Sequence, residues 1–112
     1  MEVSENVINQ RFHRLIVPHK LGILDYRPVP SRFGGRFIDH IGCAYGYYYG
    51  VETKRPGKDA TSAQRNRLID ISKAGGAAFV ISGNEGIDCF RNWLDWCRAH
   101  PVNVAHWPQI LE

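Results

Sequence analysis

The chain has 112 residues, of which 44% are hydrophobic and 22% charged, with a net charge of +3. This composition predicts a single globular domain over residues 1–112 and excludes an intrinsically disordered chain. The N-terminus lacks the apolar core of a signal peptide, no apolar run reaches the roughly 20 residues of a membrane span, and three cysteines are too few for a disulfide framework, so we expect a cytoplasmic protein with no membrane contact.

The first predicted element is a helix over residues 4–16. Apolar residues at positions 8, 12 and 15 recur at helical spacing, and Ser4 is a suitable N-cap. Glu5 lies on the same face as these apolar residues. Pro18 ends the helix, and residues 18–36 follow as an irregular connection that has room for a short strand over residues 23–26.

Two strands of a hairpin come next, over residues 37–43 and 47–54. The second strand is rich in aromatic residues, which suit a pleated surface. A capping-box pattern, Thr61-Ser62-Ala63-Gln64, starts a second helix that runs to about residue 74, where two glycines end it.

The last part of the chain predicts one more strand and one more helix. Residues 77–82 are continuously apolar or small, which is typical of a strand buried on both faces. We expect Asn84 to cap the helix over residues 84–99. The resulting order, α-β-β-α-β-α, predicts an α/β fold with a mixed sheet flanked by helices.

Polar residues on the predicted hairpin are the first sign of chemistry. Glu52 and Lys54 are two residues apart and therefore point to the same face of their strand. If Asp39 on the neighbouring strand shares that face, two carboxylates and an ammonium meet. Such carboxylates suit Mg²⁺, and a nearby lysine can position a water that attacks a phosphate. A Glu-x-Lys pair is also common on exposed strands, where it has no such role.

Gln64 has two compatible interpretations. It completes the capping box of its helix, and it begins the buried face that Leu68 and Ile71 continue. In the second interpretation its side chain lies near the Glu-x-Lys strand.

Together these residues resemble a stand-alone VRR-NUC domain, a family of the PD-(D/E)XK, restriction endonuclease-like nucleases. The resemblance covers roughly residues 36–82. It departs from the family pattern at Ile38, where the family has proline before the aspartate. The residues that carry it are Asp39, Glu52-Thr53-Lys54-Arg55-Pro56-Gly57, Thr61-Ser62-Ala63-Gln64, Leu68 and Ala74-Gly75-Gly76.

The resemblance implies a restriction endonuclease-like fold and a role for each matched residue. Asp39 and Glu52 would bind Mg²⁺ or Mn²⁺ together with the backbone carbonyl of Thr53, Lys54 would be the catalytic lysine, and Gln64 would lie beside the active site. Glu5 would match the first-helix glutamate of the acidic cluster; Glu2 competes for that role, but Glu5 has the better helical phase.

The resemblance also implies a homodimeric, metal-dependent DNA endonuclease, in some members specific for branched DNA such as four-way junctions, in the cytoplasm of a bacterial cell or a phage-infected host. Residues 11–67 carry eleven basic residues against four acidic ones, in keeping with a nucleic acid partner. The expected phosphate contacts are Arg36, Arg55, Arg65 and Arg67.

Two alternatives remain open from the sequence: a catalytically inactive nucleic-acid-binding module of the same fold, and an interaction protein whose basic surface only supports solubility. A zinc site at Cys97, His100 and His106 has only three ligands and no standard spacing. His40 is either a substrate contact or a hydrogen-bonded strand residue. Trp93 and Trp96 indicate either a dimer face or a capped core.

Overall fold

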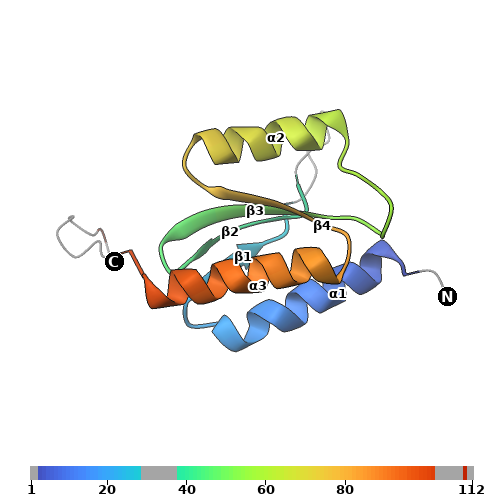
Figure 1. Cartoon of the computed structure of the whole chain (residues 1–112). Helices are drawn as coiled ribbons and strands as arrows, with labels where there is room; N and C mark the ends of the chain where they lie inside the picture. The colour runs from blue at the N-terminus through green and yellow to red at the C-terminus, as the bar shows by residue number, and fades with distance from the viewer. Residues whose placement is uncertain (1–2, 29–37, 103–109, 111–112) are drawn as a thin grey trace.

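The computed structural model describes residues 3–28, 38–102 and 110. A four-stranded sheet lies between two layers of helices, with α2 on one face and α1 and α3 side by side on the other (Figure 1). No helix in this described part of the chain is long and apolar enough to cross a membrane. The elements are α1 (Glu5–Ile16), a 3-10 turn η1 (Val17–His19), β1 (Ile23–Tyr26), β2 (His40–Ala44), β3 (Tyr47–Thr53), α2 (Ser62–Lys73), β4 (Ala77–Ile81) and α3 (Asn84–Ala99).

The sheet is mixed, and its strand order is β1-β2-β3-β4. The first three strands pair antiparallel, whereas β3 and β4 pair parallel and are connected through α2. This confirms the predicted α/β class with a mixed sheet. The structure also contains β1, the short strand over residues 23–26 that the sequence allowed between the first helix and the hairpin. The restriction endonuclease-like architecture itself remains a proposal.

The main core fills the space between the sheet and the pair α1/α3. The helices contribute side chains at helical spacing, and the sheet contributes inward-facing residues of β2, β3 and β4. Phe90 lies at its centre and contacts the rings of Phe12, Tyr49 and Phe79. The buried residues of this core are Ile8, Phe12, Ile16, Ala44, Tyr49, Val51, Ile81, Ile87, Phe90 and Leu94.

The opposite face of the sheet has a thinner apolar layer, since Leu68 is the one buried residue of α2. Close approach of α2 depends on Gly50 of β3. A Cβ atom at this position would lie 2.4 Å from Ile71 Cδ1 and 2.5 Å from Ile38 Cδ1. The glycine thus lets the helix settle on the strand that ends in Glu52 and Thr53.

Three local predictions are corrected by the structure. Asp39 lies in a bend just before β2 and not within a strand, and Phe37 falls outside the described residues. The strand β4 is not buried on both faces, because it is an edge strand of the sheet and its Val80 is 37% exposed. Gly83 takes the N-cap position of α3 without a side-chain bond, so Asn84 is the first helical residue and accepts a hydrogen bond from Arg11 instead.

Candidate metal centre

Three carboxylates from three separate parts of the chain meet at one end of the sheet. Glu5 begins α1, Asp39 precedes β2, and Glu52 lies next to the last residue of β3. One carboxylate oxygen from each lies within 4.8 Å of the others. The two carboxylates expected on neighbouring strands therefore do converge, although Asp39 reaches the site from a bend. Glu5 joins them from the first turn of α1.

Backbone hydrogen bonds fix how Asp39 and Glu52 lie relative to each other. The backbone N–H of Asp39 donates to Glu52 Oε2 over 3.1 Å, and the backbone N–H of Thr53 donates to Asp39 Oδ2 over 3.0 Å. The Thr53 hydroxyl lies 2.5 Å from the same Asp39 oxygen. Asp39 thus holds the Glu52 carboxylate, and Thr53, the residue after Glu52, holds the Asp39 carboxylate, so the two carboxylates have a fixed relative orientation. The Thr53 carbonyl remains a proposed ligand.

Glu52 is the most buried member of the cluster, with only 1% of the residue exposed. Burial raises the pKa of its carboxyl to about 7, and the nearby charge of Asp39 adds to this effect. The Asp39 N–H and the Lys54 ammonium act in the opposite direction and offset part of the rise. A cation held between these carboxylates would favour the ionised form of Glu52.

Lys54 and Gln64 both contact Glu52 at its other oxygen, Oε1. The Lys54 ammonium lies 3.6 Å from this oxygen, and its side chain is 16% exposed. The Gln64 side-chain amide donates to it over 2.8 Å. At the same time Gln64 Oε1 accepts from the Thr61 N–H, and the Thr61 hydroxyl accepts from the Gln64 N–H, so the predicted capping box is present. Both interpretations of Gln64 are therefore confirmed as contacts.

The donor set fits a hard divalent cation. Mg²⁺ and Mn²⁺ prefer oxygen ligands and are commonly bound by a few carboxylates plus waters and substrate phosphates. Glu5, Asp39 and Glu52 offer carboxylate oxygens only, with no thiolate or imidazole among them.

The expected phosphate contacts are not all on one surface. Arg55 is exposed directly after Lys54, and Arg36 falls outside the described residues. Arg65 and Arg67 are both exposed on α2, but they line different hollows, since Arg65 borders Phe79 and Val80 while Arg67 borders Ile38 and Ile41. Arg65 follows Gln64 and is the nearer of the two, along the chain, to the contacts with Glu52.

Other candidates from the sequence have structural roles. Cys97 is buried in the core, where burial raises the pKa of its thiol to about 11, and His100 stacks on Trp96. This does not suit a zinc thiolate, and His106 lies outside the described residues. Trp93 packs on Tyr49, Phe79 and Phe90, as expected for a capped core, whereas Trp96 is half exposed.

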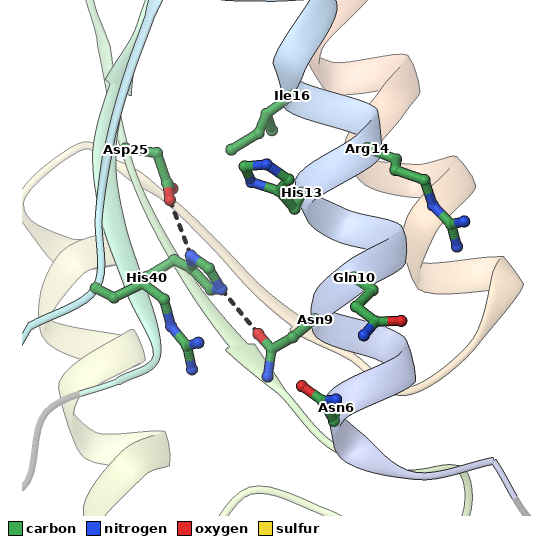
Figure 2. A pocket seen from close by; sticks show the side chains of 9 residues that line it. Asn6, Asn9, Gln10, His13, Arg14, Ile16, Asp25 and His40 are labelled. Atoms are coloured by element: carbon green, nitrogen blue, oxygen red, sulfur yellow. Dashed lines mark hydrogen bonds and ion pairs between the residues drawn. The ribbon is translucent and has the colours of Figure 1, made fainter.

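The sequence did not point to Asn9, which the structure places directly behind the cluster. Its side chain lies 2.9 Å from the Thr53 hydroxyl and borders a cavity of about 640 Å³ between α1 and the strands (Figure 2). Two signals were present: Asn9 is one helical turn from Glu5, and asparagine is disfavoured inside helices.

Comparison of the chain with family models, with curated proteins and with solved structures gave no match. The assignment of a function therefore depends on the residues and their geometry.

Proposed function

We propose that this protein is a metal-dependent DNA endonuclease of the VRR-NUC type, within the PD-(D/E)XK nucleases. The observation that carries the proposal is the meeting of Asp39, Glu52 and Lys54 at one point, with Glu5 and Gln64 beside them. Glu5 and Gln64 are 59 positions apart along the chain, yet all five side chains meet in a single cluster. A cluster of this kind next to an ammonium suits phosphodiester hydrolysis.

In this proposal Asp39, Glu52 and Glu5 hold Mg²⁺ or Mn²⁺, with the Thr53 carbonyl as a further ligand. The metal, when bound, supplies Lewis-acid activation of the scissile phosphate and of the attacking water. Lys54 hydrogen-bonds that water and offsets the negative charge that develops on the phosphate.

Gln64 has a supporting role at the same centre. Its amide donates to Glu52 Oε1, while the capping box fixes which end of the amide faces Glu52. Gln64 therefore keeps the Glu52 carboxylate in one orientation, with no direct part in proton transfer.

DNA is the proposed substrate, with branched DNA such as a four-way junction as the preferred form and a homodimer as the active assembly. The proposed phosphate contacts are Arg36, Arg55, Arg65 and Arg67. The net excess of basic residues between positions 11 and 67 supports this choice of partner.

The test is a cleavage assay on linear, nicked, flapped and four-way-junction DNA with Mg²⁺, with Mn²⁺ and with chelator. We expect metal-dependent cleavage of at least one substrate. Lys54→Ala should lower the cleavage rate by about 100-fold or more and leave DNA binding in place. Lys58→Ala, which removes an exposed lysine four positions further on, is the matched control and should cleave normally.

Each failure has a distinct meaning. DNA binding without cleavage under every metal would replace the enzyme by the inactive nucleic-acid-binding module. A wild type that neither binds nor cleaves DNA would favour the interaction protein whose basic surface only supports solubility. Unchanged cleavage by Lys54→Ala would remove the proposed role of this lysine.

A further inference from the structure

Behind the candidate metal centre, a continuous chain of polar side chains connects β1, β2, α1 and β3. Asp25 Oδ2 lies 2.9 Å from His40 Nδ1, and His40 Nε2 lies 2.9 Å from the side-chain amide of Asn9. The same amide lies 2.9 Å from the Thr53 hydroxyl, which contacts Asp39 Oδ2. Figure 2 shows the first two of these contacts, with Asn9 reaching from α1 toward His40.

The chain is shielded from solvent along most of its length. His40 is 4% exposed and Thr53 is fully buried. Buried Tyr49 donates its hydroxyl to Asp25 Oδ1, so both Asp25 oxygens have partners. Among the described residues no buried side-chain polar atom lacks a hydrogen bond. Such fully paired networks hold their members in one arrangement.

The oxygen of the Asn9 amide, Oδ1, lies at the middle of this chain. It is 2.9 Å from His40 Nε2, and the Thr53 hydroxyl donates to it over 2.9 Å. The Thr53 hydroxyl also contacts Asp39 Oδ2, so Thr53 connects Asn9 to Asp39.

The Thr53 hydroxyl donates to Asp39 Oδ2, and the Thr53 backbone N–H donates to the same oxygen. Within the described part of the chain no hydrogen bond is made to Asp39 Oδ1. The chain therefore determines which oxygen of Asp39 is occupied by the protein and which one remains for a ligand.

We infer that Asn9 and the Asp25–His40 pair are positioning residues that orient Asp39 for metal binding. This inference rests on the proposed function, because it assigns the chain a purpose at the same centre. His40 and Thr53 are buried and Asp25 and Asn9 partly buried, which has a desolvation cost that apolar side chains of similar size would not have. Residues that hold metal ligands in place commonly change metal affinity by about 10-fold to 100-fold when they are removed.

The test measures Mn²⁺ binding by calorimetry in the wild type, in Asn9→Ala and in Asn6→Ala. Asn6 is a matched control because it borders the same cavity from α1 and its side chain makes no hydrogen bond to the described residues. We expect Asn9→Ala to weaken Mn²⁺ binding by about tenfold or more and Asn6→Ala to bind like the wild type. Equal affinity of Asn9→Ala and the wild type would overturn the inference.

A second variant covers the case in which Asn9→Ala does not fold. Asp25→Asn keeps the shape of the side chain and removes its charge. Although Asp25 does not belong to the carboxylate cluster, this variant should also weaken Mn²⁺ binding, by several-fold. Unchanged Mn²⁺ affinity in folded Asp25→Asn would overturn the inference as well.

The comparison of Asn9→Ala with Asn6→Ala separates positioning of a metal ligand from simple structural support, because both variants shorten a side chain at the same cavity. Wild-type protein that binds no Mn²⁺ would overturn the proposed function and this inference together, whereas normal binding in both variants would overturn the inference alone.

Discussion

Glu52 shows how strongly one residue of the site depends on its surroundings. Its carboxylate is buried next to a second carboxylate, and these two conditions together raise its pKa to about 7. The unfolded chain, in which the carboxyl is solvated, binds the proton only below about 4.5. The folded state therefore carries one more proton than the unfolded state between these two values.

This difference predicts a pH dependence of stability in the presence of chelator. The contribution from protonated Glu52 is complete below pH 4.5 and is lost as the pH rises through 7. We expect a loss on the order of 2 kcal/mol in the free energy of unfolding, seen as a melting temperature lower by roughly 8 °C at pH 8 than at pH 5.

Two variants isolate this effect from other titrations. Glu52→Gln cannot ionise and should show a flatter dependence of melting temperature on pH. Glu85→Gln, at an exposed position in the first turn of α3, should keep the wild-type slope. If the melting temperatures of the wild type and of Glu52→Gln changed with pH by the same amount, the raised pKa of Glu52 would be wrong.

At the scale of elements, the N-terminus of α2 joins the stability of a helix to the geometry of the site. Thr61 and Gln64 form the capping box together, but only Gln64 also contacts Glu52. Thr61→Ala and Gln64→Ala should each destabilise the protein by about 1 kcal/mol through loss of the cap. Only Gln64→Ala should also lower the rate of cleavage at saturating DNA.

The two variants are therefore compared in one experiment, with chemical unfolding for stability and single-turnover cleavage for activity. Equal cleavage rates in Thr61→Ala and Gln64→Ala would show that Gln64 serves the helix alone. A lower rate in Gln64→Ala with matched stability supports its role at Glu52.

The helices could be predicted from the sequence because their signals are local. Ser4 caps α1 as expected, the capping box begins α2, and α3 covers the predicted residues 84–99. Spacing and capping depend on residues within one or two turns, so an isolated sequence contains them.

Features that depend on contacts between distant elements could not be predicted. The exposure of Val80 follows from the position of β4 at the border of the sheet, and the place of Asp39 follows from where pairing with β3 begins. The contact of Asn9 with Thr53 joins residues 44 positions apart. The candidate site could thus be named by residue type and spacing, but its supporting contacts required the structure.

For the whole molecule, the concentration of positive charge predicts how DNA binding depends on salt. Four phosphate contacts would reduce the affinity by about 100-fold when salt rises from about 50 to about 200 mM. Arg65→Ala should lower the slope of the logarithmic plot by about 1. The measurement is fluorescence anisotropy with Ca²⁺ in place of Mg²⁺.

Arg98→Ala is the matched control for this measurement. Arg65 and Arg98 are both exposed on helices, and each lies near one aspartate, Asp59 at 3.9 Å and Asp95 at 3.8 Å respectively. Arg98 lies near the end of α3, so its removal should leave the slope unchanged. An equal reduction of the slope by both variants would indicate general attraction to a basic protein.

In the proposed function, Glu5, Asp39 and Glu52 hold a divalent cation at one end of the sheet. Calorimetric titration of Mn²⁺ into the wild type, Asp39→Asn and Asp59→Asn tests this binding, since Asp59 is an exposed aspartate outside the cluster. We expect saturable binding that Asp39→Asn weakens by about tenfold or more and Asp59→Asn leaves unchanged. Equal binding by wild type and Asp39→Asn, or no binding by the wild type, would rule the metal centre out.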